Sequence, residues 1–240
     1  ALSLDPYHSL SQKNLIAAVG KKAIEQTKDL EFSEALSLLT STEALFPGNP
    51  QTLVLRYSIG QLQFYRSKED EGFKAWKAVA ERVPDSGTAK FMKGYAAHQA
   101  GKYQEAIPHY KEALAKVPDE AVFRNYFGLC LAEAGKVEEG LAQLNKAAQK
   151  KPPYLDLYLS LAQLYQRQGK IEPALMAVKS GRNLRPDFAS VHLWLAALYR
   201  AMGDQSSVGK ELGLATAGDK RPSILVHSTA PGQTVWVDSE

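Results

Sequence analysis

Apolar residues recur at helical spacing along most of the chain, in stretches that end at glycine or proline. From Ala89 onward the apolar positions follow the period of an α-helix, stop at Gly101 and resume at Tyr103. The second stretch ends at Pro118, which cannot continue a helix. The segment therefore predicts two helices joined by a short turn. Pro108 is expected within the first turn or so of the second helix, where a missing N–H costs least.

The turn residues return at a fixed interval. Prolines stand 34 residues apart at four positions, and glycines keep the same interval at four others. A period of this length is typical of repeat arrays, in which one supersecondary element stacks on copies of itself. One copy buries too little apolar surface to offset the backbone entropy of folding, so neighbouring repeats must stabilise one another. The residues that keep the interval are Pro84, Pro118, Pro152, Pro186, Gly101, Gly135, Gly169 and Gly203.

Two kinds of interior position keep the same period. Small residues form one column, which we expect to let two helix backbones approach closely, and large apolar residues form another, which we expect to interlock with the first. The small column contains Gly60, Gly94, Gly128, Ala162 and Ala196. The large column contains Trp76, Tyr110, Leu144, Val178 and Leu212.

This pattern of small residue, turn glycine, alanine, aromatic residue and closing proline resembles the tetratricopeptide repeat family. The resemblance implies an all-α fold, a right-handed α-solenoid of six stacked helix-turn-helix repeats over residues 16–222. The first repeat departs from the pattern, because Leu30 stands where the turn glycine is expected. Residues 1–15 are expected to cap the N-terminal end. The predicted repeats are 16–49, 53–86, 87–120, 121–154, 155–188 and 189–222.

The segment 223–240 follows a different pattern. Apolar and polar residues alternate on either side of Pro231 and Gly232, which predicts a short extended or β-hairpin C-terminal tail. The stretch PGQTVWVD resembles the start of a PEGA domain, a small β module of bacterial surface and envelope proteins, although Ser239 replaces its closing glycine. The resemblance implies that the parent protein continues past Glu240. It favours a periplasmic or cell-envelope location over the cytoplasm.

Composition and charge narrow the function classes. A net charge of +3 over 240 residues argues against a dedicated nucleic-acid surface, and no apolar run is long enough to cross a bilayer. The single cysteine, Cys130, lies between leucines, where a buried thiol is expected. His192 occupies a packing column and is expected to be buried with hydrogen-bond partners. The five histidines lack metal-ligand spacing and no catalytic arrangement stands out, so we expect a non-enzymatic chain without cofactor or metal.

One side of each first helix is left over for recognition. At 100° per residue the second, fifth, ninth, twelfth and thirteenth positions gather on one side, away from the expected core positions, the fourth, seventh, eighth and eleventh. In the family that the chain resembles, this stripe lines a concave groove that binds peptides. The predicted partner-binding residues are Tyr57, Gln61, Phe64, Tyr65, Phe91, Tyr95, His98, Asn125, Leu129, Gln163 and Gln166.

The aromatic members of this stripe have a second interpretation. Phe91 and Tyr95 are predicted to face the groove as binding anchors, while Lys90 and Lys93 occupy positions expected to be buried. The alternative is a helix rotated in its socket, with the aromatic rings in the core and the lysines reaching outward to water. Burial of the rings against residues 1–15 or the tail is also open.

These patterns predict a protein–protein interaction scaffold that binds a partner peptide or helix through aromatic contacts and amide hydrogen bonds. The tail favours a role in assembly of a bacterial envelope or surface complex. Two alternatives stay open: a docking or regulatory region of a larger enzyme or sensor, and a scaffold that forms a homo-oligomer. The grip on a C-terminal carboxylate used by chaperone-binding members of the family is disfavoured, because only Asn125 survives of the residues that it needs.

Overall fold

The structure is a computed structural model that describes residues 6–28, 31–218, 223–227 and 234–238. The chain divides into two compact bodies, body 1 with residues 1–123 and 150–152, and body 2 with residues 124–149 and 153–240. The described helices are α1 (Pro6–Lys28), α2 (Phe32–Leu45), α3 (Thr52–Tyr65), α4 (Glu69–Arg82), α5 (Gly87–Gln99), α6 (Tyr103–Lys116), α7 (Ala121–Glu133), α8 (Val137–Ala148), α9 (Leu155–Arg167), α10 (Ile171–Leu184), α11 (Ala189–Ala201) and α12 (Gln205–Gly218). Two strands follow, β1 (Ser223–His227) and β2 (Thr234–Asp238).

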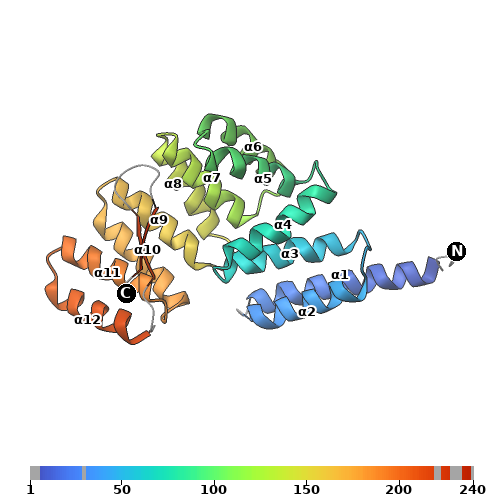
Figure 1. Ribbon diagram of the computed structural model, residues 1–240, viewed down its shortest axis with the longest axis horizontal. Coiled ribbons are helices and arrows are strands. Elements are labelled where there is room, and N and C mark those ends of the chain that lie inside the picture. Colours follow the sequence, from blue (N-terminus) through green and yellow to red (C-terminus); the bar gives the residue numbers. More distant parts are fainter. Residues whose placement is uncertain (1–5, 29–30, 219–222, 228–233, 239–240) are drawn as a thin grey trace. The chain divides into compact units, whose positions relative to one another are not determined.

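Consecutive helices pack in pairs joined by short turns, as Figure 1 shows for α5 with α6 and for α11 with α12. Neighbouring pairs also pack on each other: α2 contacts α3 and α4 contacts α5 in body 1, while α8 contacts α9 and α10 contacts α11 in body 2. Each pair thus covers apolar surface that a single pair would leave in water. The predicted all-α fold of stacked helix-turn-helix repeats is confirmed.

The turn glycines adopt the conformation that their spacing predicts. Gly101, Gly135, Gly169 and Gly203 have φ between 70° and 83°, in the left-handed region that a residue with a Cβ rarely adopts. At the first of these turns the N–H of Lys102 donates to the carbonyl of Ala97, a bond that closes the end of the preceding helix. In repeat 53–86 the same position holds Ser67, with φ of 56°. The turn therefore keeps its geometry where the glycine is missing.

The small and large columns interlock in both bodies. A Cβ added to Gly60 would lie 2.3 Å from the Trp76 ring, so the glycine makes room for the indole. Trp76, Tyr110, Leu144 and Val178 of the large column are fully buried. The prediction is wrong for Leu212, which is 37% exposed because α12 is the last described helix and no further hairpin covers it.

The buried face of the first helices differs from the predicted one. The third position of each first helix is buried and was not expected to be: it holds Leu55, Ala89, Phe123, Leu157 and Val191. The expected fourth position is only half-buried in four of the five repeats and carries Arg56, Lys90, Arg124 and Tyr158 there. The first helices are therefore rotated relative to the predicted core face, since the volume supplied by neighbouring helices decides which side is covered.

Three further predictions can be compared with the structure: the N-terminal segment, the position of Pro108 and the C-terminal strands. Helix α1 begins at Pro6, so residues 6–15 of the predicted capping segment form its first turns. Pro108 is the sixth residue of α6, in its second turn, and removes one internal hydrogen bond there. Strands β1 and β2 pair antiparallel with Leu225 opposite Trp236, and β1 contacts α11. The turn predicted at Pro231 and Gly232 lies outside the described residues.

Candidate functional site

The predicted groove residue Phe91 lies in the core of body 1. Its side chain is fully buried, and its ring stacks on Phe123 with centroids 4.3 Å apart and meets Trp76 edge-on at 5.3 Å. The prediction that Phe91 faces a groove is wrong, and the rotated-helix alternative describes it. Two glycines make room for neighbouring rings of this core, because a Cβ at Gly60 would meet Trp76 and one at Gly72 would meet Phe64 at 2.7 Å.

The lysines of α5 behave as the rotated helix requires. The Lys90 side chain is half-buried, and its Nζ lies 3.0 Å from a Glu112 carboxylate oxygen and 3.6 Å from one of Asp85. The Glu112 carboxylate raises the pKa of Lys90, with a smaller contribution from Asp85. Lys93 is exposed. The aliphatic part of Lys90 thus covers apolar surface while its charge stays at the boundary with water.

Three more predicted residues of body 1 are buried. Phe64 meets Phe73 edge-on at 5.0 Å and lies 4.5 Å from the Trp76 ring, Tyr65 lies 6.1 Å from Phe32, and the Nδ1 atom of His98 lies 3.1 Å from the Tyr110 hydroxyl. These side chains pack inside the body and are not displayed to a ligand. Their placement corrects the prediction that these residues line a binding groove, because their rings pack on other aromatic rings instead of facing water.

Tyr57 and Gln61 remain half-buried on α3, and both donate hydrogen bonds to Glu120, which the sequence analysis did not single out. The Tyr57 hydroxyl and the Gln61 Nε2, at 2.8 Å, share Oε2 of that carboxylate. The ring of Tyr57 also stacks on Trp76 at 5.7 Å, and the Trp76 Nε1–H donates to the Tyr57 carbonyl at 2.9 Å. A carboxylate just before a helix start, where capping residues stand, is the only local signal that could have pointed to Glu120.

Tyr95 is the remaining aromatic residue of the predicted stripe. Its side chain is half-buried and stacks on Phe73 with centroids 4.0 Å apart. Burial raises the pKa of Tyr95, with smaller contributions from the carboxylates of Glu69 and Asp70. Part of the Tyr95 side chain therefore remains in contact with water.

In body 2 the predicted residues separate into buried and accessible ones. Asn125 is buried, so the prediction that it binds a ligand from an open groove is wrong for this structure. Its Oδ1 has no hydrogen-bond partner among the described residues. Leu129 and Gln163 are half-buried and Gln166 is exposed. The Gln166 Oε1 accepts a hydrogen bond of 2.7 Å from the indole N–H of Trp194, which links α9 to α11. Trp194 was missed because it lies outside the projected stripe.

The last repeat is held by a buried charged network. His192 places Nδ1 2.7 Å from Glu211 and Nε2 2.8 Å from the Pro186 carbonyl oxygen, as its expected burial with partners requires. Arg182 Nη1 donates to the other Glu211 oxygen at 3.0 Å. The network connects α10, α11 and α12. Cys130 is also buried as expected, and burial together with the nearby Glu133 raises its pKa to about 12, so its thiol stays protonated and unreactive.

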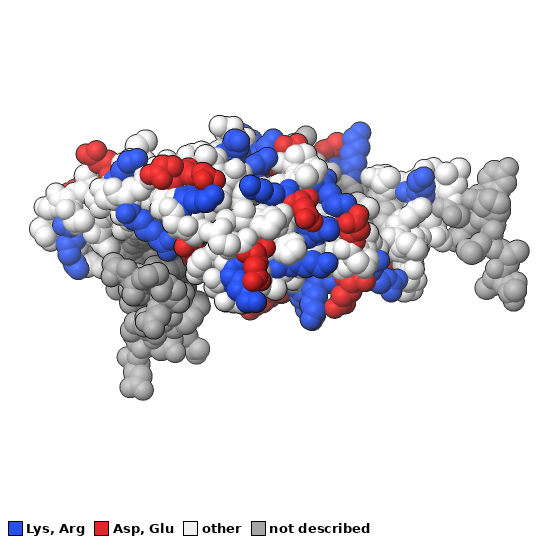
Figure 2. Space-filling model, turned by 90° about the horizontal axis from the view of Figure 1, so that it is seen from above, with Lys and Arg blue, Asp and Glu red and all other residues white. Residues whose placement is uncertain are grey.

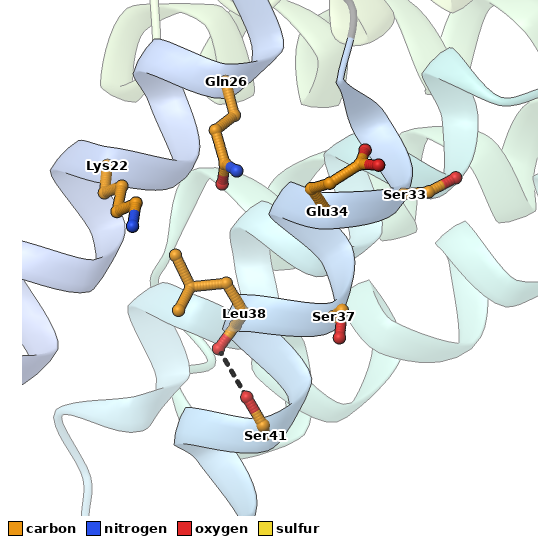
Figure 3. A pocket seen from close by; sticks show the side chains of 7 residues that line it. All are labelled: Lys22, Gln26, Ser33, Glu34, Ser37, Leu38 and Ser41. Carbon is orange, nitrogen blue, oxygen red and sulfur yellow. Dashed lines mark hydrogen bonds between the residues drawn. The ribbon is translucent and has the colours of Figure 1, made fainter.

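An open hollow of about 500 Å³ lies between α1 and α2 (Figure 3). Lys22 and Gln26 come from α1, and the Leu38 side chain extends from α2 toward them. The Ser41 hydroxyl on its rim donates to the Leu38 carbonyl at 3.1 Å. The lining mixes one cation, one carboxylate and several hydroxyls, a combination that selects no particular ligand. The other lining residues are Ser33, Glu34 and Ser37.

Surface charge is mixed in sign. Figure 2 shows Lys and Arg interspersed with Asp and Glu over the face that it displays. Many are paired, for example Lys116 with Asp85 at 2.8 Å. Within the described segments no three His, Cys, Asp or Glu side chains gather as metal ligands would. None of the helices in those segments has the length and apolarity that a bilayer crossing needs.

Comparison with known proteins identifies the repeat. Residues 57–121 and 99–154 match the family model described as tetratricopeptide repeat. Among solved structures the chain is similar to MamA, with 19% identity and a TM-score of 0.52 over 67% of this chain and 94% of that one. It is also similar to PilW, described as a widely conserved type IV pilus biogenesis factor, with 18% identity and a TM-score of 0.52 over 84% of this chain and 92% of that one.

A comparison with curated protein sequences gives no match. The matched residues include the turn glycines Gly101 and Gly135 and the first three members of each interlocking column. Residues 57–154 therefore match tetratricopeptide repeats, and the chain shares the stacked helical-hairpin fold of the solved structures that it resembles.

Proposed function

We propose that the chain is a non-enzymatic scaffold that binds a peptide or helix of a partner protein on the first-helix surface of body 2. The observation that carries the proposal is the combination of amide and apolar side chains left partly open there. Gln163 is half-buried and Gln166 exposed on α9, beside the half-buried Trp194 of α11. The remaining half-buried apolar residues of this surface are Leu129, Leu159 and Leu193.

The chemistry of this surface suits an extended or helical segment. An amide side chain both donates and accepts, so Gln163 and Gln166 can pair with the backbone of a ligand whatever its sequence. Trp194 offers a large apolar area with few rotatable bonds, which is typical of anchor residues in interfaces. The Gln166 Oε1 is fixed by the indole N–H, so its amide nitrogen is already oriented before a ligand arrives.

The finer setting that we propose is assembly of a bacterial envelope or surface complex. Two observations support it: the fold shared with PilW, a type IV pilus biogenesis factor, and the PEGA-like pattern at the C-terminal tail. A docking region of a larger enzyme or sensor and a self-associating scaffold remain hypotheses. The parent reading frame would decide the first, and a molar mass in solution the second.

A displayed library of random peptides, selected on the immobilised chain, tests the proposed surface. We expect peptides enriched on the unmodified protein to lose at least tenfold in affinity for Gln163→Ala with Gln166→Ala, about 1.4 kcal/mol. The matched control is Met176→Ala, because Met176 is 70% exposed on α10, a second helix. Equal binding to both variants, with unchanged circular dichroism, would refute this surface.

A further inference from the structure

Body 1 holds a carboxylate that is almost entirely buried. Glu120 is 2% exposed and stands immediately before α7. Its Oε2 accepts from the Tyr57 hydroxyl and from the Gln61 Nε2, both on α3, and its Oε1 accepts from the Val122 N–H at 3.1 Å. The carboxyl group therefore ties α3 to the start of a helix more than fifty residues later in the chain.

All three donors are neutral groups. The described residues supply no Lys, Arg or His that pairs with Glu120, whereas exposed carboxylates of the same body, Asp85 and Glu112, have lysine partners. A buried ionised group without a counter-charge is costly even when it accepts hydrogen bonds. A neutral carboxyl group in the same place would carry no such cost.

We propose that Glu120 is a pH-responsive tie, which holds α3 against the start of α7 when its carboxyl group is protonated and loosens when it ionises. Loosening exposes Tyr57 and Gln61, the two α3 side chains that donate to Glu120. The proposal concerns the local stability of body 1 and is independent of any partner, so it stands or falls separately from the binding surface of body 2.

The direction of the effect follows from burial. Burial raises the pKa of Glu120 above its ordinary value of 4.5, and the three hydrogen bonds only partly oppose this. The folded state therefore binds the proton more tightly than the opened state. The stabilisation of the closed state by the protonated Glu120 carboxyl group is complete below pH 4.5. It is lost as the pH rises through the pKa that Glu120 has in the folded state. Tyr57 and Tyr65 also face this carboxylate, and burial raises the pKa of each, so both stay neutral in this range.

Protonation also preserves the hydrogen bonds. A phenol hydroxyl both donates and accepts, so Tyr57 can accept the carboxyl proton while the Gln61 and Val122 N–H groups continue to donate. The neutral tie thus keeps its geometry without a buried charge. The ionised tie keeps three donors but must hold the charge away from water.

Amide hydrogen exchange of residues 53–66 and 117–124 between pH 4 and 8 tests the tie. The ratio of the exchange rates of the unmodified protein and Glu120→Gln cancels the intrinsic pH dependence of exchange. We expect this ratio to rise with pH, by at most about tenfold per unit, and then to level off. Glu112→Gln is the control, because Glu112 is exposed and the adjacent Lys90 lowers its pKa. Removing that carboxylate should therefore not reproduce the rise.

A ratio that is constant or falls between pH 4 and 8 would overturn the proposal. Tyr57→Phe provides a second measurement that does not depend on the folding of Glu120→Gln. Removing this donor should make opening more pH-dependent, because the hydrogen bond from Tyr57 lowers the pKa of Glu120. A purely structural hydrogen bond would give the same acceleration at every pH, and that outcome would also count against the tie.

Discussion

At the scale of single residues, close contact between helices depends on the absence of a side chain. Gly128 and Gly140 face each other across α7 and α8, and a Cβ on Gly128 would lie 2.8 Å from the Gly140 carbonyl oxygen and 2.9 Å from Leu144 Cγ. A backbone oxygen cannot rotate away as a side-chain end can. The spacing of the small column predicted this contact, and the structure shows which atoms enforce it.

Gly128→Ala should lower the free energy of unfolding by roughly 1–3 kcal/mol, because the added methyl group overpacks a backbone contact. The matched control is Gly209→Ala, since Gly209 is a helical residue of α12 with nothing within 4 Å of an added Cβ. There the substitution should be neutral or stabilise by up to about 1 kcal/mol, through helix propensity. Urea unfolding of the two variants measures the difference, and equal stabilities would contradict the register of the helix pair.

At the scale of elements, the rotation of α5 decides what body 1 displays. Phe91 packs against Trp76 of α4 and Phe123 of α7, while Lys90 reaches carboxylates at the edge. Sequence periodicity identified the helix but left its rotation open between two interpretations. The rings supplied by neighbouring helices settle it, because only one orientation of α5 fills the space among them.

Phe91→Ala should destabilise the protein by roughly 3–5 kcal/mol, as expected when a large aromatic side chain is removed from a packed core. Lys93→Ala, on the same helix, should change stability by no more than about 0.5 kcal/mol, because Lys93 is exposed. Chemical denaturation followed by circular dichroism gives both values. A loss below about 1 kcal/mol for Phe91→Ala would instead place that ring on the surface.

At the scale of the whole molecule, a destabilising substitution should lower the stability of its own repeat and of the adjacent ones, because repeats contact mainly their neighbours. In such arrays stability is approximately a sum of terms for single repeats and for adjacent pairs. Ile16 of α1 and Leu144 of α8 are both buried, one in the first helix pair and one within the array. Replacing either residue with alanine removes buried apolar contacts, at different places along the chain.

Ile16→Ala should speed amide exchange in α1 and α2 while leaving α9 to α11 unchanged. Each repeat contacts mainly its neighbours, so the loss of packing at Ile16 should not destabilise distant repeats. Leu144→Ala should speed exchange in α7 to α9, with a loss of roughly 2–5 kcal/mol for the deleted side chain. Exchange measured by mass spectrometry resolves these segments. Uniform acceleration of every helix by Ile16→Ala would indicate one cooperative block instead.

The sequence by itself determined the repeat, its phase and the chemistry of its turns. A left-handed φ at Gly101, the helix-ending Pro118 and the small residue at Gly128 are local demands, so they appear as a period that can be read without a structure. Much of the candidate surface could not be read in this way. Gln163 and Gln166 stayed accessible, but Phe91 and Asn125 did not, because a helical projection gives angles and not the partners that fill them.

Only the tertiary structure decided the rotation of the first helices and the bonds between distant segments. Glu120 and Tyr57 lie in different repeats, and no pattern within either repeat relates them. Their contact arises because stacking brings the start of α7 within reach of α3, and burial then removes water from the Glu120 carboxylate. Local sequence specifies which conformations the backbone adopts, whereas solvent exclusion depends on every element that packs around a site.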